Sequence, residues 1–545
     1  MSDAIVIGAG PNGLVAANIL ADAGWQVDVL EGRPEPGGAV RSDRAVHADY
    51  LHDVFSSFYP LAVASPAIGA LGLGEHGLRW SHAPTVLAHP LPDGRCATLH
   101  RGTAATCAGL DRAFGGADAE AWQRLSQLWD DLDPHLLRTL FTPFPPVRAG
   151  VAMAARLRAA GGLRALRFMT LPVRRLAQEE FTGPGAGLLL AGCALHADLL
   201  PEGVGSAAFG WLMAMLGQQV GWPVPVGGAA ALTGALVRRL EAVGGRVHCN
   251  AEVVEVVVRG GRALGVRTAD GQAYRARRAV LADVAAPALY GTLVGWEHLP
   301  PRMRADLRRF QWDFSTVKVD WALDGAVPWA ASAAAGAGTV HLGADLDELS
   351  DYALQLSTGR LPRHPFALLG QMTTADPSRS PAGTESAWAY THVPQVIKDD
   401  LGPDGITGTW DTREAEAMAN RIESQVERFA PGFKDRIVAR RILTPPVLQA
   451  WNPNLVGGAI NGGTTAPHQQ LVFRPVPGTG RPETPVAGLY LASSSAHPGG
   501  GVHGACGANA ARAALRSHRL LAGRVLAPGL AAAQRLLSGP AERHD

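Results

Sequence analysis

The sequence predicts an α/β fold in which a parallel-sheet domain, a mixed-sheet domain and a mainly helical cap region are built from alternating segments of the chain. Residues 4–7 and 26–31 are short apolar runs on either side of a helical pattern at 11–23, which is the order of a βαβ unit. Residues 100–220 show mainly helical spacing of apolar side chains. Residues 314–323 form a longer strand-like run, which indicates a second sheet.

The remaining elements are predicted in the same way, from helical spacing or from strand-like alternation of apolar side chains. Residues 247–281 alternate between apolar and polar side chains around turns at Gly260-Gly261 and Asp270-Gly271, so they predict a β-meander. The other predicted elements are helices at 230–243 and 412–429, a strand at 386–391, and a buried strand at 488–492 before a helix at 504–521.

Composition and charge exclude several classes of protein. Hydrophobic residues make up 47% and charged residues 18% of the chain, which suits a large core and argues against disorder. The net charge of +1 gives no field that would recruit nucleic acid. The five cysteines are scattered without a CxxC pair, so neither a disulfide framework nor a zinc site is expected, and no other metal-ligand spacing is present.

The apolar segments favour a cytoplasmic protein. No basic region precedes the apolar run Ala4–Ile7, so no signal peptide is expected. Residues 203–237 carry no charge, but Gln218-Gln219 and a Pro- and Gly-rich stretch interrupt them. This segment therefore predicts a buried helix followed by a loop, and not a membrane span.

The most specific motif is a glycine fingerprint at the start of the first predicted helix. Gly8, Gly10 and Gly13 form G-x-G-x-x-G, with Pro11 and Asn12 between the last two, directly after the first strand. This context predicts a Rossmann-type domain, with a diphosphate at the free N–H groups of the helix. Glu31 ends the second strand, where a carboxylate accepts hydrogen bonds from ribose hydroxyls and disfavours the 2′-phosphate of NADP.

A second glycine pair follows the acidic residue. FAD is longer than NAD and needs more backbone-lined room, so this pair favours FAD as the cofactor. Arg33 and Arg41 have two interpretations, contact with phosphate oxygens or exposure to solvent. The predicted cofactor-binding residues of this segment are Glu31, Gly32, Arg33, Gly37, Gly38, Ala39, Val40 and Arg41.

Three long stretches of the chain resemble a known family. The run from Ile5 to Ser42 is similar to the N-terminus of phytoene desaturase-like FAD-dependent oxidoreductases, which are relatives of the amine oxidases. Residues 221–253 resemble the middle block of that family, and residues 488–504 resemble its C-terminal signature. Residues 317–325, 376–394 and 452–463 resemble the branch called pyridine nucleotide-disulphide oxidoreductase domain-containing proteins.

The resemblance implies where a noncovalent FAD would lie. It implies an extended FAD between a Rossmann-type FAD-binding domain and a mixed-sheet substrate domain. Val253 matches a valine that contacts the adenine side through its backbone, and Gly501, Val502 and His503 match residues near the flavin ring. The chain departs from the family pattern at Ser493–Ser495 and in the segment 53–57, which lacks an expected glycine.

The two kinds of element alternate, so each predicted domain is discontinuous. The predicted segments are 1–100 for the first part of the FAD-binding domain, 101–220 for the helical cap and substrate region, 221–290 for the middle part of the FAD-binding domain, 291–470 for the substrate-domain sheet, 471–525 for the C-terminal part of the FAD-binding domain, and 526–545 for a tail.

The predicted catalytic residues are Lys318 and His503. Lys318 lies inside a predicted apolar strand, and in amine oxidase relatives a lysine on the corresponding strand holds a water near the flavin. The alternative is an edge-strand lysine with its stem packed and its amine in water. His503 is predicted either to donate to the flavin or to be a structural histidine, and a structural role is favoured for His497.

A basic stretch is the second notable feature. Residues 134–178 contain no acid and eight arginines, with apolar residues between them. Such a stretch is typical of a helix on an anionic membrane surface, so peripheral membrane contact through residues 138–175 is one interpretation. A solvated helix face or a protein interface is the alternative. The arginines are Arg138, Arg148, Arg156, Arg158, Arg164, Arg167, Arg174 and Arg175.

These observations predict an FAD-dependent dehydrogenase or desaturase. It would remove a hydride from a C–H bond of an apolar, isoprenoid or polyene-like substrate, while the protein supplies orientation and a dry pocket. An amine or amino-acid oxidase, a natural-product reductive cyclase and a flavoprotein with mainly a binding role are the alternatives. The sequence shows one strong dinucleotide fingerprint and nothing that resembles a second one for NAD(P)H. Oxygen, a quinone or a protein is therefore favoured as the electron acceptor. The oligomeric state is left open, with a homodimer as one option.

Overall fold

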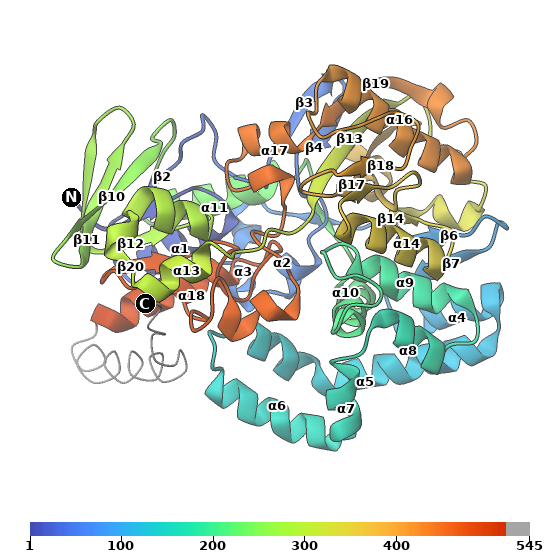
Figure 1. Cartoon of the computed structure of the whole chain (residues 1–545), viewed down its shortest axis with the longest axis horizontal. Helices are drawn as coiled ribbons and strands as arrows, with labels where there is room; N and C mark the ends of the chain where they lie inside the picture. The colour runs from blue at the N-terminus through green and yellow to red at the C-terminus, as the bar shows by residue number, and fades with distance from the viewer. Residues whose placement is uncertain (519–545) are drawn as a thin grey trace.

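The computed structural model describes residues 1–518, and its first sheet is the parallel core around the glycine loop (Figure 1). The strand β1 (Ser2–Ile7) is buried along its whole length, as a central parallel strand requires. It pairs in parallel with β2 (Val27–Leu30) on one side and with β12 (Ala273–Ala282) on the other. The outer parallel partners are β9 (Arg246–His248) next to β2 and β20 (Leu489–Leu491) next to β12.

Three helices cover this sheet beside the glycine loop. The helix α1 (Pro11–Asp22) packs against α11 (Ala230–Ala242) and against α18 (Ala505–His518). The approach of α18 is so close that a Cβ on Gly507 would lie 1.9 Å from the carbonyl oxygen of Asn12. The two ends of the described chain therefore build one structural unit.

The second sheet has seven strands and is mixed. Its order is β19-β13-β17-β16-β14-β6-β7, and β14 and β6 are the parallel pair. The helix α16 (Thr412–Phe429) packs Met418, Ile422 and Val426 into the core of this sheet. The strands are β6 (Thr85–Pro90), β7 (Cys96–Leu99), β13 (Ser315–Leu323), β14 (Ala337–Leu342), β16 (Ala367–Gln371), β17 (Glu385–Val393) and β19 (Ile437–Leu443).

A group of helices packs below the second sheet in the view of Figure 1. Its core contains Trp122, Trp129 and Trp211 together with the apolar face of α9. No helix in the described part of the chain is long and apolar enough to cross a membrane. The helices are α4 (Thr103–Phe114), α5 (Gly116–Leu140), α6 (Val147–Ala159), α7 (Leu163–Phe168), α8 (Val173–Glu180), α9 (Pro184–Ala194) and α10 (Ser206–Val220).

The structure confirms the predicted fold class and corrects two details. The segment 1–100 is not wholly part of the first domain, because β6 and β7 belong to the second sheet through the parallel pairing of β6 with β14. The predicted meander has its three strands and both turns, but it begins at Val253 and not at residue 247, because β9 pairs in parallel with β2. The meander consists of β10 (Val253–Arg259), β11 (Arg262–Thr268) and β12. The predicted tail 526–545 lies outside the described residues.

Candidate functional site

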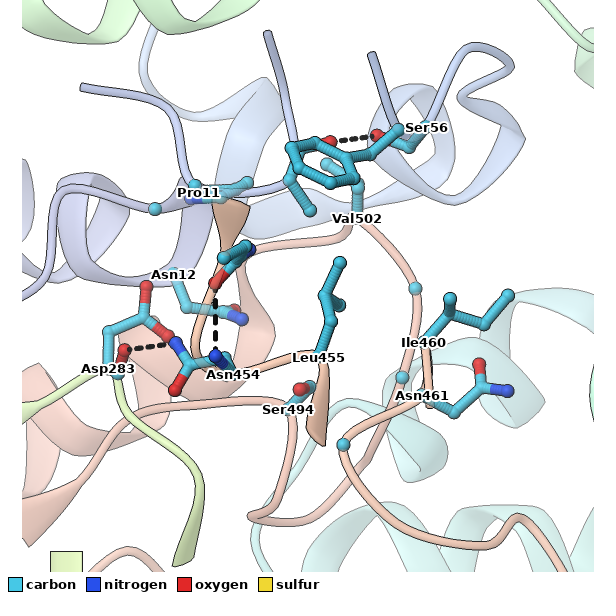
Figure 2. A pocket seen from close by; sticks show the side chains of 18 of the residues that line it. Pro11, Asn12, Ser56, Asp283, Asn454, Leu455, Ile460, Asn461, Ser494 and Val502 are labelled. Carbon is cyan, nitrogen blue, oxygen red and sulfur yellow. Dashed lines mark hydrogen bonds between the residues drawn. The ribbon is translucent and has the colours of Figure 1, made fainter. Parts of the chain in front are cut away.

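One cavity of about 710 Å³ joins the glycine loop to the second sheet. Its lining begins at the loop between β1 and α1 and continues past Asp283 at the end of β12. It ends at side chains of β13, β14 and β17. Figure 2 shows the part of this cavity between Asn12, Asp283, Asn454 and Val502.

The glycine loop brings backbone rather than side chains to the cavity. Gly10 is the residue before the first turn of α1, and a Cβ there would lie 2.7 Å from Asp283 Oδ2. Asn12 is buried in the first turn and lines the cavity, and its Oδ1 has no hydrogen-bond partner in the described structure. Pro11 has no N–H and the Gly13 N–H donates to Asp283, so the Asn12 N–H is the group of the first turn that fits a phosphate-bearing ligand.

Glu31 is fixed at the end of β2 by backbone N–H groups. Its Oε2 accepts the N–H of Ala9 at 2.8 Å, and its Oε1 accepts the N–H of Arg33 at 3.0 Å. The guanidinium of Arg33 donates to the carbonyl of Ala450 at 2.7 Å, and that of Arg41 lies 5.2 Å from the ring centre of Phe55. Both arginines line the cavity, so they are placed on its wall and not in bulk solvent.

The structure gathers most of the predicted cofactor-binding residues around this cavity. Gly13, Gly37, Val40 and His503 are absent from the lining, and three of them position the loop instead. The Gly13 N–H donates to Asp283 Oδ2 at 2.8 Å, the Gly37 N–H donates to Ala9 O at 2.9 Å, and Val40 is buried in the core. The lining residues are Gly8, Gly10, Pro11, Asn12, Glu31, Gly32, Arg33, Gly38, Ala39, Arg41, Val253, Gly501 and Val502, with Lys318 at the far end.

His503 has a structural position. Its Nδ1 accepts the N–H of Ala505 at 3.0 Å, at the first residue of α18, and its ring tilts against Phe141 at 5.3 Å. Burial lowers the pKa of His503 to about 4, so the ring is neutral near neutral pH. This geometry does not support the predicted catalytic role. His497 is likewise bound to the backbone, with Nε2 2.9 Å from Thr142 O.

Lys318 lies in the middle of the second sheet. β13 is paired on both sides, with β17 and β19, so the interpretation as an edge-strand lysine with its amine in water is wrong. The Nζ donates to the carbonyl of Asp53 at 2.8 Å, forms an ion pair with Asp320, and lies 5.8 Å from the ring centre of Trp388. Burial lowers the pKa of Lys318, and the Asp320 carboxylate opposes that shift.

Two buried carboxyl groups were not identified from the sequence: Asp283 on the cavity wall, and Asp313, which binds a loop of that wall. Asp283 follows β12 directly, and the signal was an acid at the carboxyl end of a buried strand. Asp313 accepts the N–H groups of Ile460 and Asn461 at 2.8 Å and 2.9 Å, which fixes a loop of the cavity wall. Nothing in the local sequence marks Asp313. Burial raises the pKa of both carboxyl groups to about 7.

The end of the cavity away from the glycine loop is apolar and aromatic. The rings of Trp388 and Tyr390 on β17 stack at 5.9 Å, and α10 contributes Phe209 and Met213 opposite them. His196 also lines this end, and its Nε2 lies 2.8 Å from the Nε2 of the buried His341. Burial lowers the pKa of His196 to about 3, so this pair is uncharged near neutral pH.

In the described lining, acidic residues lie only at the end of the cavity near the glycine loop. The described lining has four of them, which are Glu31, Glu35, Glu252 and Asp283. Lys318 is thus the charged side chain of the aromatic end, and its ammonium is already paired with Asp320. The aromatic end suits a neutral, apolar ligand, because burying a second cation beside Lys318 would be costly.

Comparisons with known proteins agree with this geometry. The family model for an NAD(P)-binding Rossmann-like domain matches residues 6–68. The chain is 29% identical over 561 residues to pyridine nucleotide-disulfide oxidoreductase domain-containing protein 2 of Mus musculus, covering 94% of this chain and 93% of that protein. It is 23% identical over 531 residues to one of the subunits of limonene dehydrogenase of Castellaniella defragrans, covering 94% of each.

A carotenoid enzyme and an amine oxidase complete the comparison. Phytoene desaturase (neurosporene-forming) of Rhodobacter capsulatus is 24% identical over 518 residues, covering 92% of this chain and 91% of that protein. The solved structure of cyclohexylamine oxidase from Brevibacterium oxydans has a TM-score of 0.57 at 16% identity, covering 95% of this chain and 100% of that chain. The chain is therefore similar in sequence, along most of its length, to dehydrogenases and desaturases, and it shares its fold with a solved amine oxidase.

Proposed function

We propose that this chain binds FAD noncovalently and uses it to remove a hydride from a C–H bond of an apolar, isoprenoid or polyene-like substrate. The observation that carries the proposal is the single cavity that runs from the glycine loop to the aromatic end. A dinucleotide with a long tail fits this path better than a short ligand. When bound, FAD would supply the hydride acceptor.

The residues of the cavity fit the parts of FAD in order along the chain. The first turn of α1 offers the Asn12 N–H to the diphosphate, since Pro11 has no N–H and the Gly13 N–H donates to Asp283, and Glu31 offers carboxylate oxygens to a ribose. Gly501 and Val502 line the cavity just before α18 begins. The N-terminus of that helix would favour negative charge on a reduced flavin.

The aromatic end supports an apolar substrate over a cationic amine. The described lining of this end has no carboxylate to pair with an ammonium group, and Lys318 already places one cation beside Trp388. The relatives named above are called limonene dehydrogenase and phytoene desaturase, and both names refer to unsaturated hydrocarbons. The structural likeness to an amine oxidase extends to the fold alone.

The test is anaerobic reduction of the FAD-loaded protein. The probes are limonene and phytoene, with putrescine and cyclohexylamine as the amine controls. We expect bleaching of the oxidised flavin band by an unsaturated hydrocarbon and none by the amines. Bleaching by amines alone would replace the proposal with an amine oxidase, and bleaching by NADPH alone would indicate a reductive enzyme. A protein reduced by light but by none of these compounds would favour a binding role.

We also propose that α6 and α7 contact an anionic membrane surface. These helices lie at the rim of the molecule in Figure 1 and expose Val147, Val151 and Leu163 at 68%, 70% and 83%. Three of the eight predicted arginines are paired with acids, namely Arg167, Arg174 and Arg175. In the described structure, Arg148, Arg156, Arg158 and Arg164 on the same two helices form no ion pair.

Apolar side chains among unpaired arginines match the chemistry of a bilayer with anionic headgroups. Sedimentation with phosphatidylglycerol vesicles tests this contact. We expect the protein to sediment with them at low salt, and Leu163→Ser to reduce the bound fraction. The control is Leu354→Ser on α14 (Leu346–Ser357), where the leucine is 61% exposed on another surface. Equal loss in both variants, or no binding to anionic vesicles, would contradict the proposal.

A further inference from the structure

Asp283 lies beside the glycine loop, where a bound diphosphate is expected. Its Oδ2 accepts the Gly13 N–H at 2.8 Å, in the first turn of α1. The same oxygen lies 2.7 Å from where a Cβ on Gly10 would be, so the carboxyl group packs directly against the glycine loop. The side chain belongs to the cavity wall and is placed there in Figure 2, next to Asn12 and Asn454.

The backbone of Asp283 is held in place. Its N–H donates to Ile7 O at 2.8 Å, and its carbonyl accepts the Asn454 side-chain amide at 3.2 Å. Asn454 Oδ1 in turn accepts the Ala285 N–H at 2.8 Å. The carboxyl group is therefore anchored at both neighbouring peptides, and a bound diphosphate would meet it in this position.

The surroundings of Asp283 disfavour its ionised form. Burial raises its pKa to about 7, the Gly13 N–H opposes the shift, and the Glu31 carboxylate at the end of β2 adds to it. On the α18 side the facing group is Cys506, and burial raises the pKa of that thiol to about 12, so it stays neutral. The facing residues on α1 are Pro11, Asn12 and Gly13, which do not titrate. No cation in the described structure pairs with Asp283.

We propose that Asp283 holds the cofactor diphosphate as a neutral carboxylic acid, with one oxygen accepting the Gly13 N–H and the other donating its proton to a phosphate oxygen. This inference rests on the proposed binding of FAD. An ionised Asp283 would instead set a negative charge against the diphosphate within the same loop. A carboxylic acid removes that repulsion and adds a hydrogen bond, which makes Asp283 a cofactor-binding residue that the glycine motif does not include.

Proton linkage follows with a definite sign. Below pH 7 the carboxyl group of the free protein is already protonated, so FAD binds without proton exchange. Above that pH each bound FAD must bring one proton with it, because the diphosphate raises the pKa of Asp283 further. The dissociation constant for FAD then rises by up to about tenfold per pH unit.

The experiment is calorimetric titration of the cofactor-free, full-length protein with FAD at pH 6, 7, 8 and 9. Measuring the heat at each pH in two buffers of different ionisation enthalpy gives the number of protons taken up, and this readout needs no variant. We expect no uptake at pH 6 and close to one proton per FAD at pH 8. Asp283→Asn should bind FAD at pH 8 at least as tightly as the original protein, without proton uptake.

The matched control is Asp313→Asn. Asp313 is also buried, and its pKa is also raised to about 7, but it binds the N–H groups of Ile460 and Asn461 and not the glycine loop. This variant should keep the proton uptake of the original protein. Affinity that is independent of pH, or an Asp283→Asn variant that binds more weakly at every pH, would overturn the inference. A protein that binds FAD at no pH would instead refute the proposed function.

Discussion

The buried ion pair of Lys318 offers the sharpest test of the geometry in the second sheet. Lys318 and Asp320 are two residues apart on the same face of β13, and both are buried. Asp320 has a second partner, because Arg441 on β19 donates to it at 2.7 Å. Asp320 is thus shared by two cations, whereas Lys318 depends on Asp320 and on the carbonyl of Asp53.

This asymmetry predicts unequal effects of two substitutions. Asp320→Asn leaves the Lys318 ammonium buried without its carboxylate, and losing one partner of such a pair costs about 3–5 kcal/mol. Lys318→Met leaves the Asp320–Arg441 pair intact and places an apolar stem beside Trp388. Its main loss is the hydrogen bond to Asp53 O, which is worth about 1 kcal/mol. The double variant should be more stable than Asp320→Asn alone, because it removes the stranded charge.

The assay is urea denaturation of the cofactor-free protein, followed by tryptophan fluorescence. The order of the denaturation midpoints is the informative result, since it does not depend on a two-state analysis of so large a chain. We expect the lowest midpoint for Asp320→Asn, an intermediate one for the double variant and the highest of the three for Lys318→Met. A Lys318→Met midpoint at or below that of Asp320→Asn would refute the arrangement described for these side chains.

Two further outcomes follow from single positions. Gly10→Ala should abolish FAD binding, because its Cβ would meet Asp283 Oδ2. Flavin fluorescence measures the binding, and the circular dichroism spectrum should not change. Gly69→Ala is the control, since its Cβ would meet nothing within 4 Å. Burial raises the pKa of Glu385 from its ordinary value of 4.5 to about 7, so the fold loses stability as the pH rises from about 4.5 to about 7, and the loss stays constant above pH 7. The free energy of unfolding of Glu385→Gln, relative to that of the original protein, should therefore increase by up to about 3 kcal/mol between pH 5 and pH 8. An equal difference at both pH values in denaturation experiments would contradict this.

Short-range patterns in the sequence predicted the parallel core well. The glycine fingerprint, the first helix and the acid at Glu31 lie within one βαβ unit, and their geometry depends on neighbours in the chain. The same holds for α16, whose apolar spacing reports its buried face. These features could be predicted because local conformation and binding role coincide there.

Features that depend on contacts between distant segments could not be predicted from the sequence. The assignment of β6 to the second sheet is decided by its pairing with β14, which is some 250 residues further along the chain, and no local property of residues 85–90 states that choice. The side-chain direction of His503 is set by the turn before α18, so a residue next to two cavity-lining positions turns away from the cavity. Asp283 gains its importance only when β12 lies beside β1.

The close contact between α18 and α1 has a consequence for biosynthesis. Gly507 must meet the backbone of Asn12 before the first helix has its final neighbours, although the two residues lie far apart in the chain. A nascent chain on the ribosome would thus lack the packing partner of its glycine loop until α18 emerges. Truncated chains that stop short of residue 505 should fail to bind added FAD, however well their second sheet has folded.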